Sequence, residues 1–357
     1  MSTGFTPTAS DHVRESELCA TCHTVITRAL DDAGGPVGPE FPEQVPYLEW
    51  RNSDYALGGA REASCQDCHV PTTDADGAPI ATQLSTRPRS LGTRSPVGRH
   101  VFRGANAYVL SLLARDTAWA GTDVPAATLD AASAESAANL RTAASVTLAR
   151  VEEDGDSLVV EVRVDNHTGH RFPTGYPTRR AWLRVAALDA AGAEVWVSGR
   201  YDDRGAIVDA SGARLDGPAQ TLPHRDVVTS EDEVQVWHAE MVDLAGARTH
   251  VLLRAARYSV DDRILPSGWS ASHADAARTS PVGTDGDEDF VAGSDTVTYR
   301  IPLASGATRA RVELLFQTVP PGNVEGLADH PTAAFARLVQ MMAATPPMPL
   351  VVATAER

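Results

Sequence analysis

Apolar and polar residues alternate along the middle of the chain, in short runs that predict β-strands. Leu158, Val160 and Val162 share one face of such a run, and Glu161 and Arg163 lie on the other. A period of two is the spacing of a half-buried strand. Runs of this kind, separated by Asp-Gly, Ala-Gly or Ser-Gly turns, cover 146–151, 157–164, 181–188, 194–198, 234–241, 251–256, 296–301 and 311–318. Seven or eight strands over this length predict an antiparallel, immunoglobulin-like β-sandwich.

The two ends of the chain are patterned differently. Residues 1–145 combine loops rich in Pro and Gly with helical stretches at 106–115 and 126–144. Apolar residues recur at helical spacing over 331–344 and predict a closing C-terminal helix. We therefore expect an α+β chain of two domains, a helical, loop-rich domain at 1–145 and a β-sandwich with its closing helix at 146–357.

Composition narrows the classes of partner. Hydrophobic residues make up 43% of the chain, but no run reaches the eighteen apolar residues of a transmembrane helix, so we expect no transmembrane segment. The net charge is −16, and all 31 basic residues are Arg. Such an acidic chain repels nucleic acid, which excludes that class of partner, and favours protein partners that dock through a basic face.

The four cysteines lie in two Cys-x-x-Cys-His motifs, Cys19-Ala-Thr-Cys22-His23 and Cys65-Gln-Asp-Cys68-His69. Two thiols at this spacing can add across the two vinyl groups of one haem, while the adjacent His becomes the proximal iron ligand. A Cys₄ zinc site and two disulfides are the alternatives, but neither gives a role to the two histidines. The motifs therefore predict two haem c groups with His23 and His69 as axial ligands. Haems would also supply an interior that the short helices of 1–145 lack.

Each iron needs a sixth ligand or is left open for chemistry. His100 lies in a loop, Gly98-Arg-His-Val-Phe-Arg-Gly, that is long enough to fold over a haem. His170 lies in a Pro- and Gly-rich loop that leaves a predicted strand, a setting that suits it to reach into a neighbouring domain. We expect His100 and His170 to be the distal ligands, with His12 and His224 as alternatives.

Covalent haem attachment takes place outside the cytoplasm. The first residues, Met1-Ser-Thr-Gly-Phe5, lack the basic and apolar regions of a signal peptide. We therefore expect a signal or lipoprotein leader to be absent from this sequence, and the protein to be periplasmic or extracellular.

Further segments carry a resemblance to a known family. They include Tyr47-Leu-Glu-Trp-Arg-Asn-Ser, Arg99-His-Val-Phe-Arg-Gly-Ala-Asn, Gly169-His-Arg-Phe-Pro-Thr-Gly-Tyr-Pro and Leu314-Leu-Phe-Gln-Thr-Val-Pro-Pro. Together with the haem motifs, the chain from about 15 to 352 resembles multihaem c-type cytochromes in which a haem-bearing helical region precedes a β-sandwich. The resemblance implies electron transfer through mostly bis-His haems and favours His100 and His170 as ligands. Many members carry more haems, and often have a His at the position of Tyr55.

These observations predict a dihaem cytochrome that transfers single electrons between redox partners, and we expect a carrier more than an enzyme. One alternative is a dihaem enzyme of the peroxidase or nitrogen-oxide reductase type with one open haem. Another is a structural subunit of a conductive assembly, which would associate with itself or with other cytochromes. Two acidic stretches, 201–205 and 285–289, could bind Ca²⁺ through carboxylates, although neither has the spacing of an EF-hand.

Overall fold

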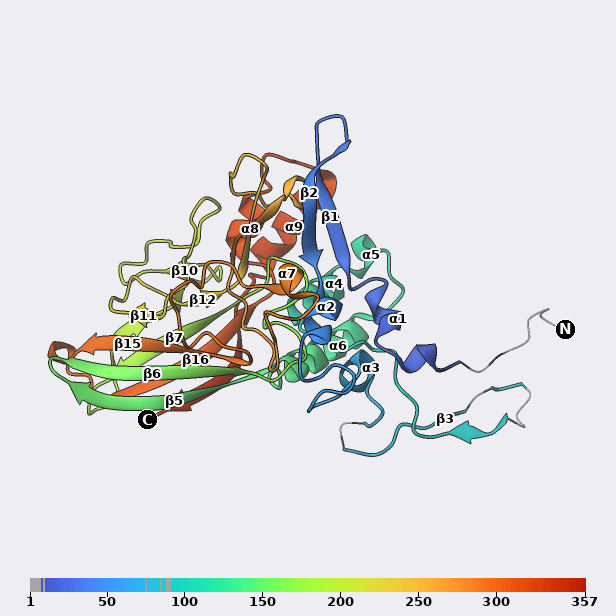
Figure 1. The fold of residues 1–357 in the computed structure, drawn as a ribbon, viewed down its shortest axis with the longest axis horizontal. Coiled ribbons are helices and arrows are strands. Elements are labelled where there is room, and N and C mark those ends of the chain that lie inside the picture. Colours follow the sequence, from blue (N-terminus) through green and yellow to red (C-terminus); the bar gives the residue numbers. More distant parts are fainter. Residues whose placement is uncertain (1–7, 9, 75, 84, 88–90) are drawn as a thin grey trace.

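The computed structural model describes residues 8, 10–74, 76–83, 85–87 and 91–357. The chain has two parts, a haem-motif region of helices and loops and a two-sheet region (Figure 1). In the haem-motif region, short helices alternate with a hairpin and a small strand pair: η1 Asp11–Arg14, α1 Glu17–Ala20, β1 Val25–Leu30, β2 Pro36–Gln44, α2 Pro46–Arg51, α3 Cys65–His69, β3 Thr82–Gln83, β4 Thr93–Arg94, α4 Ala107–Arg115, α5 Thr117–Ala120 and α6 Ala126–Leu140.

The two longest helices of this region are the ones that the sequence predicts. Helix α4 matches the stretch 106–115, and α6 starts at 126 but ends at Leu140, four residues earlier than expected. The hairpin of β1 and β2 was not predicted, because three prolines in Pro36–Gln44 are typical of a loop. Over the described residues, none of the helices is both long and apolar enough to cross a membrane.

The two-sheet region begins at residue 144. Its strands are β5 Ala144–Asp154, β6 Ser157–Asn166, β7 Arg180–Leu188, β8 Glu194–Ser198, β9 Arg200–Tyr201, β10 Ile207–Val208, β11 Val227–Val228, β12 Val236–Trp237, β13 Ala239–Val242, β14 Arg257–Asp261, β15 Ser294–Pro302, β16 Arg309–Gln317 and β17 Leu350–Glu356. One sheet has the order β11-β15-β6-β5, and the other has the order β12-β7-β16-β17 with β8 paired to β7. Neighbouring strands are antiparallel except β11 and β15, which are parallel.

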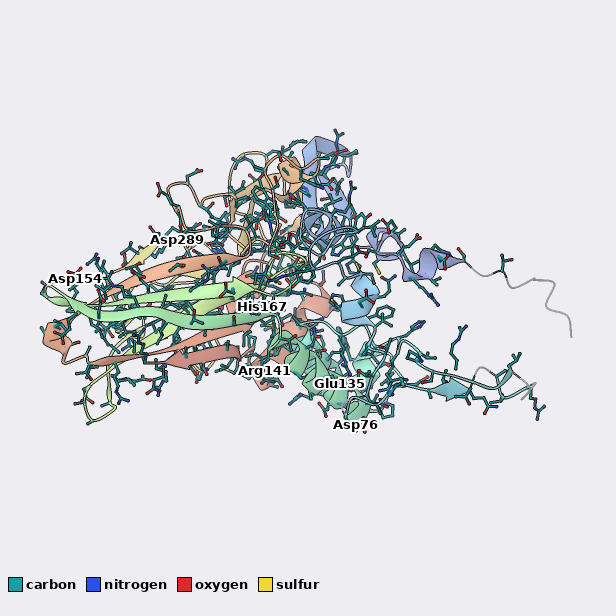
Figure 2. All side chains as sticks on the ribbon, turned by 60° about the horizontal axis from the view of Figure 1, so that its bottom comes forward. Asp76, Glu135, Arg141, Asp154, His167 and Asp289 are labelled. Carbon is teal, nitrogen blue, oxygen red and sulfur yellow. The ribbon has the colours of Figure 1, made fainter. Side chains whose placement is uncertain are left out.

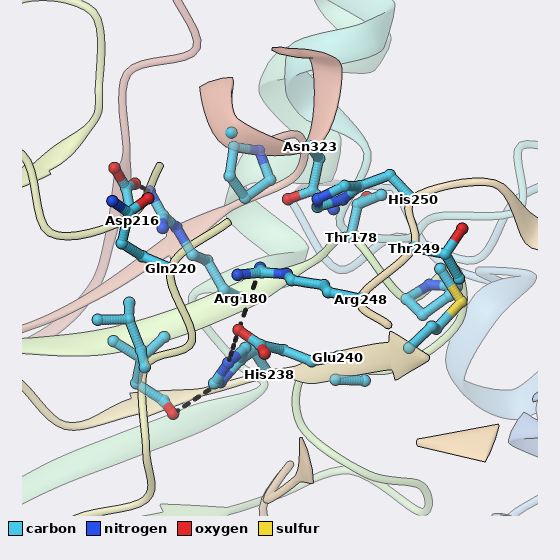
Figure 3. Close-up of a pocket in the computed structure, with 17 residues that line it drawn as sticks. Thr178, Arg180, Asp216, Gln220, His238, Glu240, Arg248, Thr249, His250 and Asn323 are labelled. Atoms are coloured by element: carbon cyan, nitrogen blue, oxygen red, sulfur yellow. Dashed lines mark hydrogen bonds and ion pairs between the residues drawn. The ribbon is translucent and has the colours of Figure 1, made fainter. Parts of the chain in front are cut away.

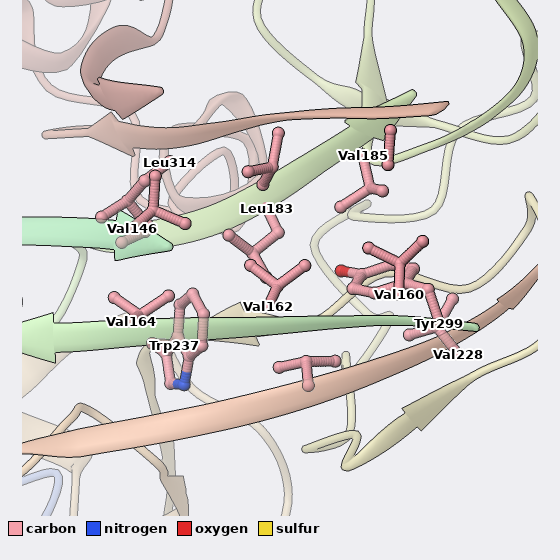
Figure 4. Packing of buried hydrophobic residues seen from close by; sticks show 14 of the residues in the cluster. Val146, Val160, Val162, Val164, Leu183, Val185, Val228, Trp237, Tyr299 and Leu314 are labelled. Atoms are coloured by element: carbon pink, nitrogen blue, oxygen red, sulfur yellow. The ribbon is translucent and has the colours of Figure 1, made fainter. Parts of the chain in front are cut away.

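Both sheets contribute to one buried hydrophobic cluster. Val160 and Val162 of β6 point toward Leu183 and Val185 of β7, and Trp237 lies beside them (Figure 4). All five side chains are 0% exposed. The inward face of β6 is the apolar face that the period of two predicts, because successive side chains of a strand point to opposite sides of a sheet.

Several predicted elements need correction. The stretch 251–256 was expected as a strand but contains the 3₁₀ turn η3 at Leu252–Arg254. The stretch 234–241 forms two short strands, β12 and β13, on either side of His238. Helix α9, Ala333–Ala344, does not close the chain, because β17 follows it and pairs with β16. Short helices α7 Ala276–Thr279 and α8 Pro321–Glu325 and the turn η4 Leu303–Ser305 complete the region.

The two regions meet at one end of the β5–β6 hairpin. Asp154 and His167 lie at opposite ends of this strand pair, and His167 is the end that faces the helices (Figure 2). Backbone and side-chain hydrogen bonds cross the boundary. The Asp54 amide donates to the carbonyl of Ser267 at 2.7 Å, and the Tyr55 hydroxyl donates to the carbonyl of His167 at 2.9 Å.

Candidate haem sites

The second Cys-x-x-Cys-His motif is a short helix with a complete capping box. In α3, the Ser64 hydroxyl accepts from the Asp67 amide at 3.2 Å, and the Asp67 carboxylate accepts from the Ser64 amide at 2.8 Å. This reciprocal pair satisfies two amides that a helix N-terminus leaves unpaired. The helix places Cys65 and Cys68 three residues apart, on the same side of one turn. His69 follows at its end.

The two motifs contact each other. Ser16, which is 2% exposed and precedes α1, accepts a hydrogen bond from the Cys65 amide at 3.1 Å through its hydroxyl. The Gln66 side chain donates to the Glu15 carbonyl at 2.8 Å. Partial burial, followed by the neighbouring Cys65 thiol, raises the pKa of the Cys19 thiol above its ordinary value. None of the four cysteines forms a disulfide. The two motifs are therefore adjacent, and their cysteines are not paired with each other.

His170 is held by a buried asparagine at the end of β6. The Asn166 amide donates to the carbonyls of His170 at 2.8 Å and Ile264 at 3.1 Å. Its side-chain oxygen accepts from the amide and the hydroxyl of Thr168, both at 2.8 Å. Asn166 is 2% exposed, so these bonds form away from solvent. One side chain thus fixes the loop that presents His170.

His69 and His170 face each other across the boundary between the two regions. Their ring centroids are 6.2 Å apart, and the ring planes are within 17° of parallel. Two metal–nitrogen bonds of about 2 Å each would hold the centroids of two coaxial imidazoles about 6 Å apart. The spacing therefore fits a pair of axial ligands on one metal ion.

Both rings also have the hydrogen bonds that metal ligands need. The Nδ1 atom of His69 bonds the carbonyl of Arg103, and the Nδ1 atom of His170 bonds the carbonyl of Arg171 at 3.0 Å. A carbonyl only accepts, so each Nδ1 carries a proton, and in a neutral ring this leaves the lone pair on Nε2. Burial, and next the nearby His69, lower the pKa of His170 to about 4. At neutral pH this ring is uncharged, as a ligand must be.

The loop of His170 lies directly on the segment after α2. A Cβ atom added at Gly169 would be 3.0 Å from Cδ1 of Trp50 and 3.0 Å from Cβ of Tyr55, closer than nearly all real contacts. The Trp50 indole itself donates to the carbonyl of Ala63 at 2.9 Å. Glycine at 169 thus permits the close approach that brings His170 toward α3.

The other predicted ligands have different surroundings. His23 is exposed at the end of the first motif, and His100 is exposed with its ring 5.8 Å from that of Phe102. His12 is exposed, and its ring bonds the Ser10 hydroxyl at 2.7 Å. His224 has both nitrogens engaged, by Asp262 at 3.1 Å and Asp287 at 2.8 Å. Among the described residues, none of the close ring pairs joins one of these four imidazoles to another.

The surroundings of the motifs fit a large apolar cofactor. Leu18 beside Cys19 is 45% exposed, and Phe102 is 66% exposed next to the carbonyl that bonds His69. These exposed apolar side chains near the motifs are compatible with an apolar group bound there. The zinc alternative fits less well. In the described part of the chain, the groups of three or more potential donors close enough to share one ion include no cysteine.

A polar pocket in the two-sheet region is not a second cofactor site of this kind. Its cavity of about 30 Å³ lies among Arg180, Asp216, His238, Glu240 and Arg248 (Figure 3). Ion pairs among the lining residues satisfy most of their charge, with Arg180–Asp216 at 2.6 Å and Arg248–Glu240 at 3.1 Å. The space holds one or two water molecules.

Comparison with known proteins gives one finding. No protein-family model and no curated protein matches the chain. Among solved structures, the chain is similar to a penta-heme cytochrome c552 from Thermochromatium tepidum, with 17% sequence identity and a TM-score of 0.49. The match covers 97% of this chain and 56% of that one, so this chain spans little more than half the length of that protein.

Proposed function

We propose that this chain is a dihaem c-type cytochrome that relays single electrons between redox partners outside the cytoplasm. The observation that carries the proposal is the His69–His170 pair, parallel and 6.2 Å apart beside a Cys-x-x-Cys-His helix. Haem supplies one-electron chemistry when it is bound, and two imidazoles on one iron favour a low-spin state that changes little on reduction. Cys65 and Cys68 would attach this haem.

The second haem of the proposal is attached at Cys19 and Cys22, with His23 as its proximal ligand. Contact between Ser16 and Cys65 brings the two attachment sites together, which supports rapid electron exchange between two haems. His100 remains the proposed distal ligand of the first iron, with His12 as the alternative. We further propose that residues 1–145 form the haem domain and that 146–357 form an immunoglobulin-like sandwich domain, which donates His170.

The net negative charge of the chain is the basis for proposing the kind of partner that it binds. The net charge of −16 favours a redox partner with a basic docking face and an association that weakens with salt. Association with copies of itself or with other cytochromes would suit the same role. Periplasmic or extracellular location follows from covalent haem attachment, and bis-His ligation favours low reduction potentials.

The difference between the two motifs keeps one alternative open. His170 approaches His69, whereas His23 is exposed and its described ring contacts include no second imidazole. An iron without a sixth protein ligand could bind peroxide or a nitrogen oxide, as in a dihaem enzyme.

Carbon monoxide binding to the reduced protein separates carrier from enzyme. A carrier with both irons closed should bind carbon monoxide slowly or not at all at neutral pH, and should show negligible peroxidase activity. Rapid binding of one equivalent per chain, lost when Cys19 and Cys22 are replaced by Ala, would assign an open site to the first haem and favour the enzyme.

A further inference from the structure

Three distant segments of the two-sheet region bring a histidine and several carboxylates together. His224 and Asp226 precede β11, Asp287 and Asp289 lie in the loop before β15, and Asp295 is the second residue of β15. Donor atoms of His224, Asp287 and Asp295 all lie within 4.8 Å of one another. Asp226, Asp287 and Asp289 form a second group of this size, which shares Asp287.

The histidine is oriented by a buried carboxylate. Nδ1 of His224 lies 3.1 Å from Oδ2 of Asp262, whose other oxygen accepts from the backbone amide of His238 at 2.7 Å. Asp262 is 0% exposed. Nε2 of His224 lies 2.8 Å from Oδ2 of Asp287. A carboxylate on one ring nitrogen, with the other directed at further donors, is the arrangement that surrounds histidine ligands of metals.

Asp295 and Asp287 are each oriented by hydrogen bonds to one of their two carboxylate oxygens. Oδ2 of Asp295 accepts from the indole of Trp237 at 2.6 Å, whereas its Oδ1 is buried and has no hydrogen-bond partner among the described residues. Asp295 is 0% exposed. Oδ1 of Asp287 accepts from the amides of Asp289 at 3.0 Å and Phe290 at 2.9 Å, which leaves Oδ2 facing His224. A buried carboxylate oxygen without a partner is costly unless a proton or a cation neutralises it.

We propose that His224, Asp287 and Asp295 bind one divalent transition-metal ion, for which Zn²⁺ is the matching probe. The ion would take the place of the proton between His224 and Asp287 and give the free oxygen of Asp295 a partner. An imidazole with two carboxylates suits Zn²⁺, whereas Ca²⁺ takes oxygen ligands. Donors on one Zn²⁺ lie at most about 4.2 Å apart. A small inward movement therefore completes the site, which would fasten the 287–295 loop to the sheet.

Zinc uptake by the intact haem-loaded protein tests this site. After chelator treatment and dialysis, the wild type should bind one equivalent of Zn²⁺ per chain, and its thermal unfolding temperature should rise with added Zn²⁺. Asp295→Asn keeps an acceptor for Trp237 but weakens the ligand, and should reduce zinc affinity on the order of 100-fold. Trp237→Phe, which removes only the supporting hydrogen bond, should reduce it by about 10–100-fold.

The matched control is Asp203→Asn, in the other acidic stretch, which should leave zinc affinity unchanged. Zinc X-ray absorption of the wild type should show one imidazole among oxygen ligands, and this readout does not require a variant to fold. Failure of the wild type to take up zinc, equal affinity of Asp295→Asn and wild type, or a bound zinc without imidazole would overturn the proposal. So would Ca²⁺ binding that is tighter than zinc binding and unaffected by His224→Gln, because it would assign the site to Asp226, Asp287 and Asp289.

Discussion

The haem-motif region and the two-sheet region of this protein differ in what fills their interiors. Residues before 144 make up about two fifths of the chain, yet among described residues they supply nine of the 56 buried hydrophobic side chains and eight of the sixteen large exposed ones. The two-sheet region has a continuous core shared by both sheets. The two-sheet region buries its apolar side chains in a core of its own, whereas the haem-motif region leaves a larger share of its apolar side chains exposed.

The difference in buried apolar surface suggests a different source of stability for each region. A region with few buried side chains gains little free energy from apolar burial, and a covalently attached haem would provide the missing apolar surface. The two-sheet region has a core of its own, shared by both sheets, and this core supports the loop of His170. Asn166, at the end of β6, and the buried Arg171, paired with Asp261, fix the loop of His170 from this side. In the proposed function, the two-sheet region thus positions an iron ligand for the haem-motif region.

Removal of the second attachment site should have the largest effect. Replacement of both Cys65 and Cys68 by Ala should lower the haem content from two per chain to one, because in the proposed function each pair of thiols attaches one haem. Loss of this apolar interior should also make residues 10–143 sensitive to protease, while strands β5–β7 keep slow amide exchange. Haem counting on denatured protein and exchange by mass spectrometry measure both. Equal loss of protection in the two regions would show that they do not fold independently.

A cavity in the two-sheet core should lower the stability of the protein and leave its haem spectra unchanged. Leu183 is 0% exposed between the sheets, so Leu183→Ala should lower the free energy of unfolding by about 2–5 kcal/mol. The haem spectra of the folded variant should not change, because the cavity lies among strands and not beside a motif. Denaturant unfolding followed by both tryptophan fluorescence and haem absorbance tests this. A spectral change in the native variant would couple the core to the haem.

The stability of the two-sheet region should depend on alkaline pH through His238. Burial alone lowers the pKa of His238, but hydrogen bonds to Asp262 and Glu240 outweigh burial and raise it to about 9. A pKa raised above its unfolded value contributes stability that is complete below about pH 6.5 and is lost as pH rises through about 9. We expect a loss of roughly 3 kcal/mol between pH 6 and pH 10. His238→Gln should reduce this dependence, and the exposed His330→Gln should leave it unchanged.

The smallest effect is expected at the hydrogen bond that joins the regions. Tyr55→Phe removes the donor to the His167 carbonyl and should cost about 1 kcal/mol of stability. The same substitution should leave carbon monoxide binding unchanged, since the hydroxyl is already engaged with the loop. A faster reaction with carbon monoxide in the variant would instead make Tyr55 part of a distal pocket.

Local patterns made much of the fold predictable. The strand at 157–164 was confirmed because its alternation indicates which face is buried, and the strand at 194–198 because it is a short run of β-branched and aromatic residues. Strand β17 was missed, since Leu350–Glu356 follows a Pro-rich stretch and gains its partner only through β16. The hairpin of β1 and β2 was missed for a similar reason. Local sequence patterns do not show which strands pair when the strands are far apart in sequence.

The site was predictable only in part. His170 was identified from the Pro- and Gly-rich character of its loop, but its pairing with His69 depends on contacts between residues about 100 apart. The carbonyls that orient both rings are backbone atoms, which no sequence pattern identifies. His224 was predicted as an alternative ligand, but both of its nitrogens contact carboxylates. These carboxylates belong to Asp262 and Asp287, which are far from His224 in sequence, so the sequence alone does not show the contacts.

The most direct test of the account is the spin state of His170→Ala, with His167→Ala as the control from the same loop. His167 is exposed and bonds the Ser145 hydroxyl at 2.8 Å, so its loss removes an imidazole without touching the His69 pair. Low-temperature electron paramagnetic resonance of the ferric protein measures each haem separately. The account predicts that His170→Ala converts one low-spin haem per chain to high-spin, that added imidazole restores it, and that His167→Ala changes neither haem. Two unaltered haem signals in His170→Ala would contradict the proposed ligand pair and the role given to the two-sheet region.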